Sequence, residues 1–87
     1  MKYLIIKKHG LELPVIFSEI ESHDEVANKL NVLSDLVSAG FCRFEMDENG
    51  DGTAALSVRC WGKSVSLGIQ SRPEDEFLIY KQNQFKI

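Results

Sequence analysis

Residues 41–69 read FCRFEMDENGDGTAALSVRCWGKSVSLGI, and three runs of alternating apolar and polar residues in this stretch decide the predicted fold. The last two runs flank Trp61-Gly62-Lys63-Ser64, where a glycine at the first central position of a two-residue loop favours a type II′ hairpin turn. In the register set by this turn, one face carries Leu56, Val58, Cys60, Val65, Leu67 and Ile69. The other face carries Ser57, Arg59, Trp61, Ser64, Ser66 and Gly68. A shift of one residue would expose the whole apolar set, so the pattern predicts this hairpin.

The first run adds a third strand to the hairpin. Cys42, Phe44 and Met46 alternate with polar residues, and the turn that follows, 47–52, is rich in residues that tolerate positive φ. To share a face with the apolar residues of the next strand, Cys42 or a diagonal neighbour must lie near Cys60. The stretch therefore predicts a β-meander.

Length and composition indicate one globular domain, residues 1–87. A chain of 87 residues can bury a single core. Its contents of 44% hydrophobic and 26% charged residues are ordinary for a folded protein. The net charge of −3 lacks the basic character expected of a non-specific nucleic-acid binder. The sequence shows no apolar run of membrane-spanning length and no signal-peptide pattern, so we expect a cytoplasmic protein that makes no use of a membrane.

The chain before the meander predicts two strands and a helix. Apolar residues of Lys2–Lys8 and Leu11–Phe17 flank a turn at His9-Gly10, and Pro14 makes the second strand an edge strand or points that position outward. Ser22-His23-Asp24-Glu25 is a capping box, which predicts a helix from His23 to about Asn31 with His23 exposed in its first turn.

The remaining segments complete an α+β fold. Residues 33–40 either continue the first helix or begin the next strand, with an interruption at Gly40. Ser71-Arg72-Pro73-Glu74 predicts a second helix from about Pro73 to Lys81, followed by a tail, residues 82–87, that pairs with an edge or mediates association. The predicted order is β-β-α-β-β-β-α, an antiparallel sheet with two helices packed on one face and the other face partly open.

No motif in the chain predicts catalysis, a cofactor or a metal. The Asp47-x-Asn49-x-Asp51-Gly52 pattern matches half of a calcium loop, but position twelve is Val58 instead of the required glutamate. Cys42, Cys60, His9 and His23 lack the close ligand pairs of a zinc module. There is no nucleophile elbow, phosphate loop or dinucleotide fingerprint, so we expect a non-enzymatic protein with no small-molecule substrate.

The two cysteines are expected to be reduced, buried thiols on the apolar face, because secretory features are missing from the sequence. A cross-strand disulfide would require the two residues to lie directly opposite each other.

The open sheet face is the candidate interaction site. Arg59 and Trp61 stand on it among small neighbours, and Lys63 and Arg72 extend its positive charge. Tryptophan and arginine are common interface anchors, so this face predicts binding of another protein or self-association. Alternatively, Trp61 stacks a base with Arg43, Arg59 and Lys63 nearby, as in a small nucleic-acid-binding domain. A third possibility is that residues 33–40 or the tail cover Trp61.

Several short segments resemble small uncharacterised bacteriophage and prophage proteins. These segments are Val37-Ser38-Ala39-Gly40-Phe41, residues 60–68, Ser71-Arg72-Pro73-Glu74-Asp75, and the Gly10-Leu11-Glu12-Leu13-Pro14-Val15 and Ser22-His23 pieces near the start. The resemblance brings no assigned activity. It implies a phage-encoded accessory protein that acts on a host or phage protein in the host cytoplasm.

Overall fold

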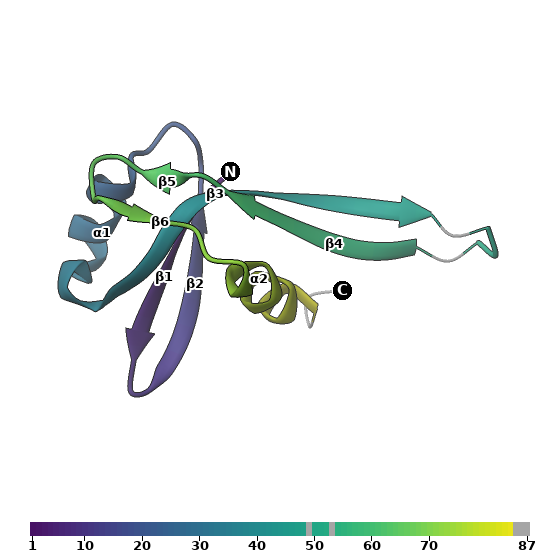
Figure 1. The fold of residues 1–87 in the computed structure, drawn as a ribbon, viewed down its shortest axis with the longest axis horizontal. Helices are drawn as coiled ribbons and strands as arrows, with labels where there is room; N and C mark the ends of the chain where they lie inside the picture. Colours follow the sequence, from purple (N-terminus) through teal and green to yellow (C-terminus); the bar gives the residue numbers. More distant parts are fainter. Residues whose placement is uncertain (49, 53, 85–87) are drawn as a thin grey trace.

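Four strands form the main sheet of the computed structural model, which describes residues 1–48, 50–52 and 54–84 (Figure 1). The elements in chain order are β1 (Lys2–Lys8), β2 (Leu11–Phe17), α1 (His23–Leu30), the 3₁₀ turn η1 (Leu33–Asp35), β3 (Leu36–Glu48), β4 (Ala54–Trp61), β5 (Lys63–Ser64), β6 (Ile69–Gln70) and α2 (Glu74–Gln84). The α+β class, the antiparallel sheet and the predicted order are confirmed, apart from η1 and the division of the last predicted strand into β5 and β6.

The first hairpin forms as predicted. Its turn residues His9 and Gly10 have φ values of 53° and 79°, and positive φ at both central positions is the geometry of a type I′ turn. The sheet order β2-β1-β3-β4 places β2, with Pro14, at an edge. Proline is tolerated there because an edge strand has one side without ladder hydrogen bonds.

The Ser22 cap starts α1 where the sequence predicts it. The Glu25 backbone N–H donates to the Ser22 hydroxyl at 3.4 Å, and Asn31 ends the helix in the left-handed conformation. Of the two alternatives for residues 33–40, the strand is confirmed, because one 3₁₀ turn leads directly into β3 at Leu36. The interruption predicted at Gly40 is wrong, because β3 runs through Gly40, which pairs with Tyr3 of β1.

The hairpin predicted around Gly62 and Lys63 is wrong. β4 pairs with β3 along its whole length, from Phe41 opposite Trp61 to Glu48 opposite Ala54, and β5 and β6 form a separate two-stranded sheet. The other edge of β4 is occupied where the predicted strand would pair, because the Cys60 backbone N–H donates to Glu76 Oε2 of α2 at 2.8 Å. Val65, predicted to be in the core, is 84% exposed.

The prediction that both helices pack on one face is also wrong. Leu4 and Ile6 of β1 join a buried cluster with Val26 and Ala27 of α1, whereas Tyr3 and Ile5 join a second cluster with Ile79 of α2. Successive residues of a strand point to opposite faces, so the two helices cover opposite sides of the sheet, as Figure 1 shows. The physical reason is that residues 3–6 form a continuous apolar run, which needs cover on both faces.

β3 and β4 continue past the body as a long two-stranded arm (Figure 1). The molecule measures 46 × 27 × 20 Å along its principal axes, with the arm along the longest. Figure 1 shows α1 and the β5–β6 hairpin on one side of the arm base and α2 on the other. In α2, which extends to Gln84, Ile79 is buried and Phe77 is 64% exposed. Of the tail predicted for residues 82–87, residues 82–84 belong to α2 instead, and residues 85–87 lie outside the described residues.

Candidate interaction surface

Trp61 lies at the base of the arm and contacts both an aromatic ring and a cation. It is the last residue of β4, and its directly opposite partner on β3 is Phe41. The two rings stack with centroids 6.2 Å apart and an interplanar angle of 23°. The guanidinium carbon of Arg43 lies 5.8 Å from the centroid of the Trp61 ring, within the range of a cation–π contact. Trp61 nevertheless remains 47% exposed, so its ring is oriented but accessible.

A row of rings connects Trp61 to the protein interior. Phe41 packs edge-on against His23 at 5.9 Å, and His23 packs edge-on against Phe17 at 5.4 Å. The expectation that His23 is exposed is wrong, because it is only 5% exposed and its Nε2 lies 2.9 Å from the Gly40 carbonyl oxygen. This polar contact satisfies a buried ring nitrogen and fixes the His23 ring behind Phe41.

Two arginines extend the surface along the arm. Arg43 and Arg59 are directly opposite on β3 and β4, and both are exposed. Like charges directly opposite each other in a sheet are destabilising, so this pair costs stability in the free protein. Arg43 also forms an ion pair with Glu45 at 2.7 Å on the same strand. We refer to Arg43, Arg59, Trp61 and Lys63 as the Trp61 face.

Lys63 follows Trp61 in the chain, across the turn at Gly62. It lies two residues beyond Trp61, at the start of β5, and is exposed. The backbone turns at Gly62, with φ of 80°, where an added Cβ would lie 2.9 Å from the Phe41 ring. A glycine therefore permits both the turn and the close packing that supports the Trp61 ring.

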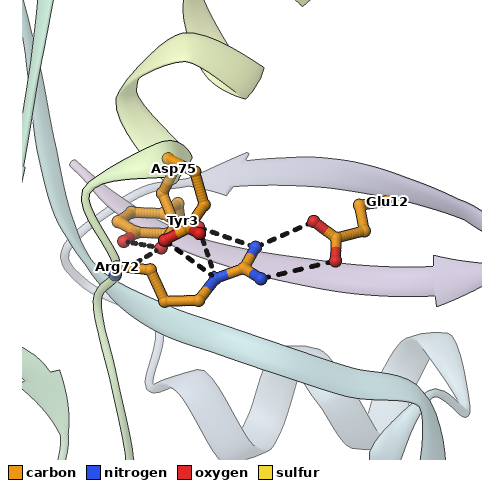
Figure 2. Close-up of polar contacts among 5 residues, drawn as sticks. Tyr3, Glu12, Arg72 and Asp75 are labelled. Carbon is orange, nitrogen blue, oxygen red and sulfur yellow. Dashed lines mark hydrogen bonds and ion pairs between the residues drawn. The ribbon is translucent and has the colours of Figure 1, made fainter.

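Arg72, the fourth predicted site residue, is engaged elsewhere. Its two terminal nitrogens donate to the two Glu12 carboxylate oxygens at 3.3 and 3.0 Å, and its Nε donates to Asp75 Oδ1 at 3.0 Å (Figure 2). Its guanidinium connects α2 to β2 instead of extending the charge of the Trp61 face.

The cluster around Arg72 was missed by sequence reasoning. Asp75 is fully buried and accepts hydrogen bonds from the Tyr3 hydroxyl at 2.6 Å and from the Arg72 backbone N–H at 2.9 Å (Figure 2). The bond from the Arg72 N–H to the Asp75 carboxylate is the capping-box bond of α2. It joins Arg72 and Asp75, one residue later than the predicted pair Ser71 and Glu74. The Arg72 hydrogen bonds lower the pKa of Glu12, and burial raises the pKa of Tyr3. The cluster anchors the start of α2 to the two N-terminal strands.

The residues considered for zinc binding do not gather into one cluster. Within the described part of the chain, no group of three or more His, Cys, Asp and Glu side chains could hold a metal ion. Cys42 faces Cys60 on the α2 side, and His23 packs between aromatic rings. Asn49 of the calcium-like pattern lies outside the described residues.

A search of protein-family models finds no match to the chain, and comparisons with curated proteins and with solved structures find no significant match. No helix in residues 1–48, 50–52 and 54–84 is both long enough and apolar enough to cross a membrane.

Proposed function

We propose that this chain is a non-enzymatic protein-interaction module that binds its partner through the Trp61 face. The observation that carries the proposal is the half-exposed Trp61 ring, which stacks on Phe41 and has the Arg43 guanidinium over it. Large aromatic and arginine side chains supply most of the binding free energy in protein interfaces. A ring already fixed by its neighbours loses little further conformational entropy when a partner binds it.

The charge of the surface favours an acidic partner segment. Arg43, Arg59 and Lys63 supply three positive charges around Trp61, and Glu45 supplies a negative charge that pairs with Arg43. An acidic partner would also relieve the repulsion between the opposed arginines, so the cost present in the free protein becomes a gain on binding. The partner is a host or phage protein, as the resemblance to bacteriophage proteins implies, or a second copy of this chain.

Light scattering after size exclusion separates these two partners. Wild type, Trp61→Ala and Arg59→Ala are compared at matched concentration, with Phe77→Ala as a control that removes an exposed aromatic from α2. A wild-type dimer that becomes a folded monomer only in the first two variants identifies a second copy as the partner. A wild-type monomer directs the search to another protein. Unfolding of both face variants would contradict the proposal, because it would assign the two residues to the core.

A single-stranded nucleic acid is the second candidate ligand. It is favoured by one observation, the arginine stacked over an exposed tryptophan, since such pairs stack bases and contact phosphates. Trp61 is the only tryptophan in the chain, so its fluorescence reports directly on this face. Titration with a single-stranded oligonucleotide should then quench the fluorescence with an affinity that falls as salt is added. An affinity insensitive to salt would count against nucleic acid.

A further inference from the structure

The two cysteines lie directly opposite each other at the arm base, Cys42 on β3 and Cys60 on β4. Both side chains belong to the apolar cluster on the α2 side of the sheet. Direct opposition is the first requirement for a cross-strand disulfide.

Backbone hydrogen bonds show which kind of opposed pair this is. The Cys42 N–H donates to the Met1 carbonyl oxygen at 2.9 Å, and the Cys42 carbonyl accepts from the Met1 amino group at 3.2 Å. On the other strand, the Cys60 N–H donates to Glu76 Oε2 at 2.8 Å. These backbone groups point away from the facing cysteine, so Cys42 and Cys60 form a non-hydrogen-bonded pair.

This pairing brings the two side chains close together. Opposed residues of a non-hydrogen-bonded antiparallel pair have Cα atoms about 4.5 Å apart, closer than in a hydrogen-bonded pair. A disulfide requires a Cα separation of roughly 4.4–6.8 Å, so the pair lies at the short end of the permitted range.

We propose that Cys42 and Cys60 are a reversible modification site at which a small-molecule disulfide, such as oxidised glutathione, introduces a cross-strand disulfide. The Cys60 thiol loses its proton and its sulfur attacks one sulfur of the oxidant, which releases one glutathione thiolate and leaves a mixed disulfide. The Cys42 thiol then loses its proton and attacks the Cys60 sulfur, which releases the second glutathione thiolate. The two released thiolates take up the two protons, so the protein loses two electrons and the oxidant gains them.

Burial sets the order and speed of these steps. Cys42 is fully buried whereas Cys60 is partly exposed, so the oxidant reaches Cys60 first. Desolvation raises the pKa of Cys42, and it raises the pKa of Cys60 to about 12. Since the thiolate is the attacking species, exchange is slow near neutral pH and accelerates as the pH rises. Without an oxidant the pair therefore remains two inert thiols.

The position of the pair gives the bond a structural consequence. Along the two strands, Cys42 and Cys60 lie between the Phe41–Trp61 pair and the Arg43–Arg59 pair. A disulfide at this point joins the two strands that carry the Trp61 face, on the opposite side of the sheet. It also closes the loop of the arm, which restricts the unfolded chain. The oxidised protein should therefore unfold at a higher temperature than the reduced protein.

The test is to unfold the protein and refold it in glutathione mixtures of increasing oxidised fraction, so that slow exchange in the folded state does not limit the result. Acid-quenched samples are analysed by intact mass and by counting free thiols. The expected product is a monomer that has lost the mass of two hydrogen atoms and both free thiols, with a raised unfolding midpoint. Cys42→Ser and Cys60→Ser serve as controls that cannot form it.

Three outcomes would overturn the proposal. The first is that wild type retains both free thiols in the most oxidising glutathione mixture. The second is that the mixed disulfide with glutathione accumulates on wild type to the same extent as on the single-cysteine controls. The third is disulfide-linked dimer in place of the intrachain bond.

Discussion

Gly40 shows how a single residue positions the Trp61 face. A Cβ added there would lie 2.5 Å from the Trp61 carbonyl oxygen and 3.2 Å from Ser71 Cβ. The Gly40 carbonyl oxygen also contacts His23 Nε2, which supports Phe41 from behind. The absence of a side chain at this position therefore allows β3, the end of β4 and the chain before α2 to meet.

Gly40→Ala should destabilise the protein by about 1–3 kcal/mol, the usual cost of overpacking a tight interior. The cost arises because the new methyl group meets the Trp61 backbone carbonyl oxygen, which has little freedom to move aside. Urea unfolding measures the change. Gly50→Ala is the matched control, because a Cβ added at Gly50 has no neighbour within 4 Å, and its stability should stay close to wild type. Equal losses in both variants would show that the close approach at Gly40 is unimportant.

Asp75→Ala should destabilise the protein more than Gly40→Ala does. The free energy of unfolding should fall by about 3–5 kcal/mol, as is typical when one partner of a buried ion pair is removed. It leaves the Tyr3 hydroxyl without its acceptor and removes one of the three carboxylates that pair with Arg72, the other two being Glu12 and Glu74. Tyr3→Phe removes only the hydroxyl, so it should lose about 0.5–1.5 kcal/mol, or somewhat more because the acceptor is charged. Denaturant unfolding of both variants checks the ranking, and the reverse order would contradict the assigned geometry.

At the scale of elements, the Glu12–Arg72 pair connects edge strand β2 to the start of α2. The Arg72 hydrogen bonds lower the pKa of Glu12 below its ordinary value of 4.5. A carboxylate with a lowered pKa in the folded state contributes stability above its ordinary value. That contribution disappears as the pH falls through the lower, folded-state value.

The free energy of unfolding should therefore decline as the pH falls below about 4.5, in part because Glu12 takes up a proton. In Glu12→Gln this part of the decline should be missing, so the curve for the variant should be shallower than wild type. Glu48→Gln, which alters an exposed carboxylate at the end of β3, outside this cluster and away from both helix starts, should retain the wild-type slope. A Glu12→Gln curve parallel to wild type would exclude the pair as a source of acid sensitivity.

The sequence predicted those elements whose signals are local. The Ser22 cap, the turn at His9 and Gly10, and the alternation that places Cys42 and Cys60 on one face all operate within one element or one strand pair. The turn at Gly62 failed because its outcome depends on a distant group, the Glu76 carboxylate, which occupies the edge of β4. A local turn preference carries no information about which edge of a strand is already covered.

Within the candidate site, too, the sequence predicted only the features that local signals determine. Arg59 and Trp61 lie on one exposed face because strand alternation alone determines it. The contact between Arg43 and the Trp61 ring depends on the register between β3 and β4. The long turn that joins these strands allows more than one register, so the sequence did not determine this contact. The engagement of Arg72 by Glu12 required knowing that α2 crosses to the N-terminal strands, a tertiary arrangement with no signal in residues 71–75.

At the scale of the whole molecule, the two helices stabilise a sheet from which a two-stranded arm projects (Figure 1). The Trp61 face lies where the arm leaves the body, on the side of the sheet opposite α2. This position combines a rigid base, supplied by the aromatic row, with open surface along the arm. A partner segment bound at Trp61 could therefore continue along the arm past the two arginines.

The central claim, that the Trp61 face binds an acidic protein segment, is tested most directly by selecting a random peptide library on the immobilised protein. Trp61→Ala and Arg59→Ala are selected in parallel, and Phe77→Ala is the control. We expect wild type and Phe77→Ala to enrich the same peptides, rich in aspartate and glutamate, and both face variants to lose them. Enrichment of those peptides on folded Trp61→Ala, or no enrichment on wild type, would contradict the claim.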